Sequence, residues 1–204
     1  MNYTWKRVRK WLKPKQDAIY YEERKKALDS IKYLGKTGYL KLFYGDATHF
    51  SLDPSISSAW QPNEYLKIVP QKTKVTTVFG LISTDLTSKF ATFSGNLTTD
   101  DLLPFLENFA KQQQQPTVIV LDNAPIHRSK KMKKAITEWK ELYDVFVFFL
   151  PPYSPHLNLI EIVWRKMKYD WLPPSVYQNS DTLFTAIQAI LSAFGTQFIV
   201  HFST

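Results

Sequence analysis

Three acidic residues stand in sequence contexts that suit chemistry on phosphate groups. Asp46 and Asp122 each follow an apolar run typical of a β-strand, and Glu161 opens an amphipathic segment typical of a helix. Two metal ions about 3.5–4 Å apart, held by carboxylates, can activate both oxygens of a phosphoryl transfer. Mg²⁺ prefers oxygen ligands, so Asp and Glu suit it and His or Cys do not. The pattern predicts a site for two Mg²⁺ or Mn²⁺ ions.

The predicted secondary structure decides whether these carboxylates can meet. Strands are predicted at residues 39–44, 75–83, 89–93, 117–121 and 145–149, and helices at 100–113, 130–143, 159–171 and 183–194. This order predicts an α/β fold: a mixed five-stranded sheet, three antiparallel strands then parallel strands, with helices on both faces. Asp46 and Asp122 would end neighbouring strands. Glu161 would reach them if its helix packs across the same edge of the sheet.

The first 34 residues differ from the rest of the chain. Residues 5–13 are basic, with aromatic residues at helical spacing, and Pro14 ends that stretch. Residues 17–33 follow as a charged helix with a weak apolar stripe. We interpret residues 1–34 as a basic helical arm and residues 35–204 as the domain that carries the carboxylates.

Composition excludes several classes of protein and of site. Hydrophobic residues make up 44% of the chain, which rules out a disordered protein. Without cysteine the chain has no disulfides, thiolate zinc sites or thiol nucleophiles. No apolar run is long enough to cross a membrane, and the N-terminus does not resemble a secretory signal, so a cytoplasmic protein is expected. The net charge of +8 suits nucleic acid as a partner, but ordinary solubility explains it equally well.

The contexts of the three carboxylates resemble the catalytic blocks of bacterial insertion-sequence transposases of the mariner superfamily. The resemblance covers roughly residues 38–172 and rests on Tyr44-Gly45-Asp46, on Leu121-Asp122-Asn123-Ala124-Pro125-Ile126-His127, and on Leu150-Pro151-Pro152-Tyr153-Ser154-Pro155 with Leu157-Asn158, Ile160-Glu161 and Val163-Trp164. It implies a ribonuclease-H-like domain whose DDE triad is Asp46, Asp122 and Glu161. By this resemblance Asp46 bridges the two metal ions, and Asp122 and Glu161 hold one each.

The same resemblance implies the partners. They are double-stranded DNA, as transposon ends and target, and a second copy of the chain bound on that DNA, in a bacterial cytoplasm at the nucleoid. Two departures from the family pattern stand out. Leu159 replaces a proline, and the helix-turn-helix module that recognises transposon ends is represented only by a stretch resembling its tail. Trp60, in the long connection after the first strand, is either a hydrophobic anchor or a contact in the dimer.

Several residues near the triad have alternative interpretations. Asn158 and Glu161 have the spacing of a capping box, and a glutamate bonded to its own cap cannot also hold a metal ion. His127 is either a surface loop residue or a contact to the scissile phosphate or to water near the site. Arg165 and Lys168 lie four and seven residues beyond Glu161 and either face the DNA backbone or, for Arg165, pair with Glu161. Because converging carboxylates repel, at least one should have a raised pKa.

The leading functional hypothesis is metal-dependent DNA strand cleavage followed by strand transfer. One alternative is a ribonuclease-H-like nuclease that cuts without joining strands. The other is a truncated, non-catalytic remnant that binds DNA or inhibits a full-length transposase.

Overall fold

A five-stranded mixed sheet forms the centre of the molecule in the computed structural model, which describes residues 17–53 and 75–202. The strands lie in the order β3-β2-β1-β4-β5; the first three are antiparallel, and β4 and β5 run parallel to β1. Their bounds are β1 Lys41–Phe50, β2 Thr76–Ile82, β3 Ser88–Ser94, β4 Thr117–Leu121 and β5 Val145–Phe149. The predicted sheet is confirmed. The basic stretch 5–13 and Trp60 lie outside the described residues.

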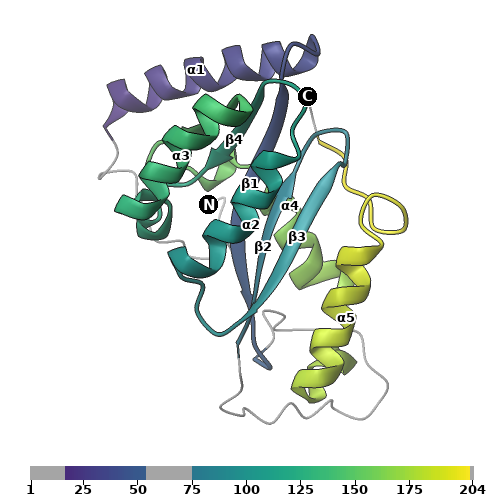
Figure 1. Cartoon of the computed structure of the whole chain (residues 1–204). Helices are drawn as coiled ribbons and strands as arrows, with labels where there is room; N and C mark the ends of the chain where they lie inside the picture. Colours follow the sequence, from purple (N-terminus) through teal and green to yellow (C-terminus); the bar gives the residue numbers. More distant parts are fainter. Residues whose placement is uncertain (1–16, 54–74, 203–204) are drawn as a thin grey trace, which may run out of the picture.

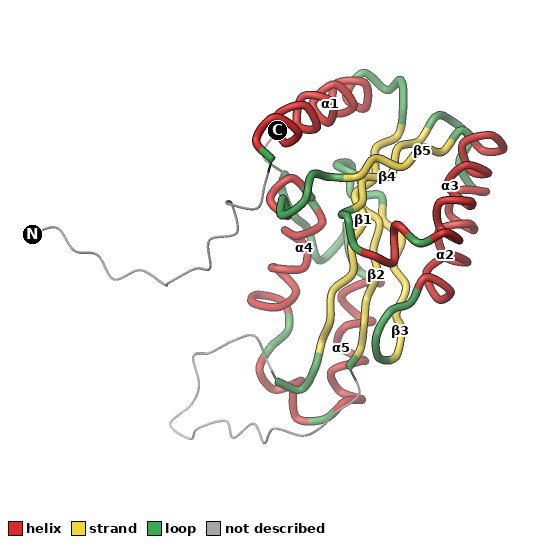
Figure 2. Tube along the Cα trace, turned by 90° about the vertical axis from the view of Figure 1, so that its left-hand side faces the viewer, coloured by secondary structure: helices red, strands yellow, loops and turns green. Residues whose placement is uncertain are grey.

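Helices cover both faces of the sheet, as predicted (Figures 1 and 2). One face carries α2 (Thr99–Lys111) and α3 (Lys130–Tyr143); the other carries α1 (Ala18–Lys36), α4 (Ile160–Lys166) and α5 (Ser180–Ser192). A π-helical turn, Met167–Trp171, extends α4. Short 3₁₀ turns occupy Pro125–Arg128, Pro155–Leu157 and Pro174–Gln178. None of the described helices is both long and apolar enough to span a membrane.

Helix α1 packs against the sheet. Leu28 is fully buried in the core that also contains Leu40 and Leu42. Arg24 donates hydrogen bonds to the carbonyl of Phe149, and its guanidinium lies 3.8 Å from the centroid of the Phe148 ring. Asp17 caps the helix by accepting hydrogen bonds from two backbone N–H groups. The division of the chain near residue 34 remains a prediction.

Strand β1 is longer than predicted, and this corrects the expected position of Asp46. Pairing with parallel β4 stops at Tyr44 opposite Val120, whereas pairing with antiparallel β2 continues to Phe50 opposite Thr76. Asp46 therefore lies inside β1, opposite Gly80, and does not end the strand. It lies two residues beyond Tyr44, the last residue of β1 that pairs with β4. Because the β4 edge of β1 is unpaired at this point, the Asp46 side chain can approach residues that follow β4.

Alternation along β1 sends neighbouring residues to opposite faces of the sheet. Asp46 shares a face with Tyr44, toward α4, while Gly45 faces the core beneath α2 and α3. A Cβ atom on Gly45 would lie 2.7 Å from Leu121 Cδ2 and 2.8 Å from Leu81 Cδ2. Glycine at this position thus allows β1 to pack closely beside Asp46.

We predict that Gly45→Ala lowers stability through this overpacking. The expected loss is about 1–3 kcal/mol, seen as a lower midpoint in thermal unfolding. Gly35→Ala is the matched control, because its new Cβ would meet Leu42 Cβ at an ordinary 3.4 Å and alanine favours the helix. Equal midpoints for Gly45→Ala and the unmodified chain would contradict the packing described here.

Candidate active site

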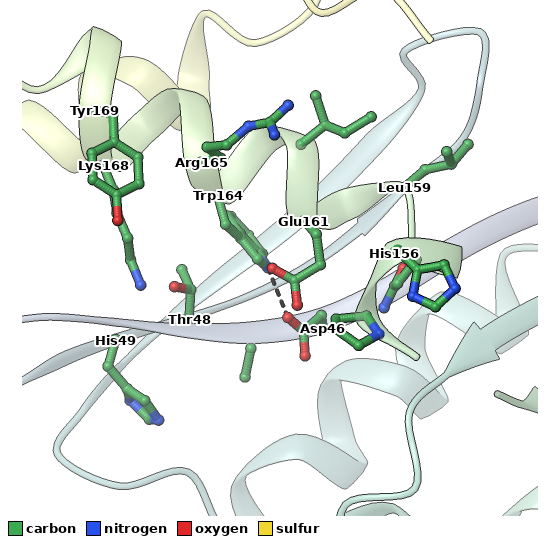
Figure 3. A pocket seen from close by; sticks show the side chains of 14 residues that line it. Asp46, Thr48, His49, His156, Leu159, Glu161, Trp164, Arg165, Lys168 and Tyr169 are labelled. Atoms are coloured by element: carbon green, nitrogen blue, oxygen red, sulfur yellow. Dashed lines mark hydrogen bonds between the residues drawn. The ribbon is translucent and has the colours of Figure 1, made fainter. Parts of the chain in front are cut away.

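The three predicted carboxylates line one pocket. This pocket has a volume of about 460 Å³, and its wall includes Asp46, Asp122 and Glu161. A larger groove of about 700 Å³ shares Asp46 and Glu161 and continues along α4 past Arg165 and Lys168 (Figure 3). The structure thus brings together residues that lie 39 or more positions apart in the sequence.

Asp46 is the most buried of the three carboxylates. Its Oδ2 accepts a hydrogen bond of 3.1 Å from Trp164 Nε1, the dashed contact in Figure 3. Burial, together with repulsion from Glu161, raises the pKa of Asp46 to about 7. The expectation that at least one carboxylate has a raised pKa is confirmed.

Asp122 follows the last residue of β4 and is held by two donors. Its Oδ1 accepts hydrogen bonds from the Ala124 N–H at 2.9 Å and from His127 Nδ1 at 2.8 Å. Burial raises the pKa of Asp122, but these hydrogen bonds outweigh it and leave the pKa below its usual value.

His127 is a partner of Asp122 and does not lie on the surface. The 3₁₀ turn Pro125–Arg128 folds its ring inward, where it is 1% exposed and packs edge-on to Phe79. The surface-loop interpretation is therefore wrong. The reason is local: the turn brings His127 back onto the carboxylate five residues before it. The contact to the scissile phosphate or to water near the site stays a prediction, because His127 lines a pocket together with Asp46 and Asp122.

Glu161 lies in the first turn of α4, and in Figure 3 its carboxylate points toward Asp46. Partial burial raises its pKa, although the positive charge of Lys168 opposes the shift. The capping-box alternative is not realised. The cap position of α4 is Leu159 and has no side-chain hydrogen bond, while the Asn158 side chain donates to the Gly45 carbonyl instead. Glu161 is thus free of the competing role.

The two predicted cations behave differently. Lys168 is half-buried in the π-helical turn, with its ammonium 5.6 Å from the centroid of the Phe50 ring. Burial lowers its pKa, against the attraction of Glu161 and Asp46. Arg165 is exposed on the wall of the groove, and its guanidinium points away from Asp46 (Figure 3). Within the described residues Arg165 forms no ion pair with Glu161, so that alternative is not realised.

Sequence reasoning missed two residues at this site. Trp164 enters the sequence analysis only as part of the family motif, yet its indole N–H donates a hydrogen bond to Asp46 Oδ2. Its position three residues after Glu161, on the same helix face, is the signal that could have found it. Asn158 was considered only as a cap, and nothing in the sequence pattern indicates that it bonds to β1.

The donor set fits a hard divalent cation. Carboxylate oxygens suit Mg²⁺ or Mn²⁺, and the buried carbonyl oxygen of Asn158, which has no hydrogen-bond partner, adds another oxygen on the same pocket wall. Within residues 17–53 and 75–202, no three His, Asp or Glu side chains form a group close enough to hold one ion. Asp46, Asp122 and Glu161 must therefore draw closer together to share a metal ion.

The raised pKa of Asp46 gives a testable dependence of stability on pH. Between its ordinary pKa of 3.8 and about 7, the folded state holds a proton that the unfolded state has lost, so stability falls as pH rises. Asp46→Asn removes the loss of stability that comes from ionising this carboxyl in the folded state. In EDTA above pH 7 we expect the variant to be more stable by about 1–2 kcal/mol, a gain that disappears below pH 4. Thermal unfolding across this pH range measures it.

Glu138→Gln, an exposed change on α3, is the control and should differ from the unmodified chain by the same small amount at every pH. If Asp46→Asn and the unmodified chain have parallel pH profiles, the carboxyl of Asp46 is not destabilising.

Solved structures share this fold at low sequence identity. The Mos1 strand transfer complex aligns with a TM-score of 0.63 and 16% identity, over 95% of this chain and 59% of the Mos1 chain. The Mos1 mariner paired-end complex with Mn aligns with a TM-score of 0.60 and 15% identity, over 94% and 60% of the two chains. The catalytic domain of Mos1 mariner transposase aligns with a TM-score of 0.54 and 13% identity, over 87% of this chain and 83% of the Mos1 chain. The sheet and its helices are therefore the ribonuclease-H-like fold.

A sequence relative comes from Sinorhizobium fredii (strain NBRC 101917 / NGR234). Described as uncharacterized protein y4pE/y4sA, it is 34% identical over 68 residues, which cover 33% of this chain and 45% of that protein. The chain thus spans less than two thirds of this relative and of Mos1 in its complexes. The family model for the DDE superfamily endonuclease matches residues 41–184, which include all three carboxylates. Because that match covers more than half of the chain, the protein belongs to the DDE superfamily endonuclease family.

Proposed function

We propose that this chain is the catalytic domain of an insertion-sequence transposase, which cuts a DNA strand and joins the freed end to a target. The observation that carries the proposal is the pocket where Asp46, Asp122 and Glu161 meet. Family membership supports a nuclease or transposase, and the similarity to Mos1, solved as a strand transfer complex, supports strand joining. Mos1 has also been solved with Mn, which supports a divalent ion here.

The proposed chemistry assigns each carboxylate a role. Asp46 would bridge two Mg²⁺ or Mn²⁺ ions, with Asp122 and Glu161 holding one each. When bound, such ions stabilise negative charge on the attacking and leaving oxygens. Trp164 and His127 orient the carboxylates of Asp46 and Asp122 through their N–H groups. The raised pKa of Asp46 means that its full negative charge develops most easily once a cation is present.

Two phosphoryl transfers would follow one another. In cleavage, a water oxygen attacks the phosphorus, the bond to the 3′ oxygen breaks, and the proton lost by water balances the proton gained by the 3′ oxygen. In joining, the freed 3′ hydroxyl attacks a phosphorus in the target. A new P–O bond forms, and the displaced target 3′ oxygen leaves as a hydroxyl. As the resemblance to transposases of the mariner superfamily implies, the proposed target is a thymine-adenine dinucleotide.

The groove along α4 is the proposed path of the DNA. Lys168 and Arg165 supply positive charge on its wall, and the chain carries a net charge of +8. The proposed assembly is a homodimer on double-stranded DNA, at the nucleoid of a bacterial cytoplasm. His127 lines a neighbouring pocket with Asp46 and Asp122, so its contact to the scissile phosphate or to water remains part of the proposal.

Magnesium or manganese should stabilise the folded chain. At tenfold the dissociation constant we expect a gain of about 1.4 kcal/mol, measured as a higher thermal midpoint. Asp122→Asn and Glu161→Gln should remove most of this gain, because each deletes a charged ligand. Asp100→Asn is the control, since Asp100 is exposed and pairs with Lys131 away from the pocket. A midpoint that does not respond to either metal would contradict the proposed site.

Activity separates the competing functions. The unmodified chain is incubated with Mn²⁺, a labelled duplex with a free 3′ hydroxyl and supercoiled plasmid, and joined products are sequenced. Joined strands at thymine-adenine sites are expected, and Asp122→Asn should abolish them. Nicked plasmid without joining would indicate the nuclease, and metal binding with neither reaction would indicate the non-catalytic remnant.

The role of Lys168 can be tested through salt dependence. If its ammonium neutralises one phosphate, Lys168→Gln should make the slope of log affinity against log salt shallower by about 0.9. Binding of a short duplex in EDTA, titrated at several salt concentrations, measures the slope. Lys36→Gln, at the exposed end of α1, should leave the slope unchanged. An unchanged slope for Lys168→Gln would remove this residue from the interface.

A further inference from the structure

Asn158 connects the two elements that carry Asp46 and Glu161. Its side-chain Nδ2 donates a hydrogen bond of 3.0 Å to the carbonyl of Gly45, the residue before Asp46. Its own backbone carbonyl accepts a hydrogen bond of 3.2 Å from the N–H of Glu161. One residue is therefore bonded to the neighbour of one carboxylate and to the backbone of another, across 113 positions of sequence.

The other end of the Asn158 amide is unpartnered. The Gly45 carbonyl can only accept, so Nδ2 must face it and Oδ1 must point elsewhere. The residue is 4% exposed, and within the described chain Oδ1 has no hydrogen-bond partner. Asn158 also lines both the pocket of the three carboxylates and the groove along α4. A buried acceptor without a partner costs stability, and its place on the wall of a pocket indicates a ligand with a donor group.

We propose that Asn158 is a positioning residue of the carboxylate site and a contact for what binds there. Its amide N–H fixes the start of α4 against β1, so that Glu161 faces Asp46. Its carbonyl oxygen accepts a hydrogen bond from water that accompanies a divalent cation between the carboxylates. The inference rests on the proposed metal-dependent function, because it requires a cation in that pocket. Mg²⁺ keeps several of its waters when bound to protein, which supplies the donor.

A purely structural role explains less of the geometry. As a helix cap, the Asn158 side chain would bond to an N–H group in the first turn of α4, and it does not; only its backbone carbonyl does. As a simple clamp on Gly45 it would need only a donor. The buried carbonyl oxygen without a partner would then lower the stability of the folded state and serve no purpose. Binding of a hydrated cation accounts for both ends of the amide.

The test measures Mn²⁺ affinity without DNA, by the electron paramagnetic resonance signal of free Mn²⁺. Asn158→Ala and Asn158→Leu should each bind Mn²⁺ about 10–100-fold more weakly than the unmodified chain, as is typical when a partner beyond the direct ligands is lost. Leucine has the branched shape of asparagine but is larger, and it removes both the N–H donor and the unpartnered oxygen, so this variant leaves no cavity. Melting curves in EDTA show which variants are folded.

Asn179→Ala is the matched control. It removes the cap of α5, where Asn179 accepts hydrogen bonds from two backbone N–H groups outside the pocket. It should lower the thermal midpoint and leave Mn²⁺ affinity unchanged, which separates lost stability from lost binding.

The outcomes distinguish this inference from the function on which it rests. If the unmodified chain binds Mn²⁺, Asp46→Asn does not, and a folded Asn158 variant binds as tightly as the unmodified chain, the role of Asn158 is overturned and the metal site stands. If the unmodified chain binds no Mn²⁺, the metal-dependent function itself fails. If affinity falls only in proportion to the thermal midpoint, as Asn179→Ala would reveal, Asn158 is structural alone.

Discussion

The burial of neighbouring carboxylates, which also repel one another, is the constraint around which this domain is built. Asp46, Asp122 and Glu161 come from a strand, a loop and a helix, and they face one pocket. Two of the three have raised pKa values, which shows that the fold holds them against their electrostatic preference. Packing and hydrogen bonding elsewhere must supply the stability that this arrangement costs.

The carboxylates are not supported equally. Asp122 has two N–H donors and a lowered pKa, so its charge is already balanced by the protein. Asp46 has an indole donor but deeper burial, and Glu161 relies on the field of Lys168. This difference in how well the three charges are stabilised follows from where each residue lies in the fold. Asp122 sits where the backbone turns and exposes N–H groups, whereas the backbone of Asp46 is committed to pairing with β2.

Much of this architecture could be predicted from sequence because it depends on local patterns. Strand β5 and helix α3 were predicted at their observed bounds, and the Ser129 side chain caps α3. Helix α2 begins at Thr99, one residue before the predicted start, because Thr98 and Asp101 form a reciprocal capping box. The triad could be named because its three blocks are contiguous in sequence and resemble a known family.

What could not be predicted depends on the three-dimensional arrangement of the chain, in most cases on partners distant in sequence. Asp46 lies within β1 because β2 is longer than β4, and no pattern within β1 records the length of its neighbours. His127 is buried because a turn folds it onto Asp122, although a polar loop residue is usually exposed. Asn158 matched a helix cap, a local role, but its amide bonds to Gly45. For Asp46 and Asn158 a long-range contact overrode the local pattern, and for His127 a local turn overrode the usual exposure of a polar loop residue.

The attachment of α1 bears on the smallest fragment that can fold independently. Truncation just before β1 would remove Leu28 from the cluster with Leu40 and Leu42 and leave that apolar surface in water. It would also leave the carbonyl of Phe149, at the end of β5, without the guanidinium of Arg24. A minimal autonomous unit therefore starts no later than Asp17, which caps the helix, even though the family match begins at residue 41.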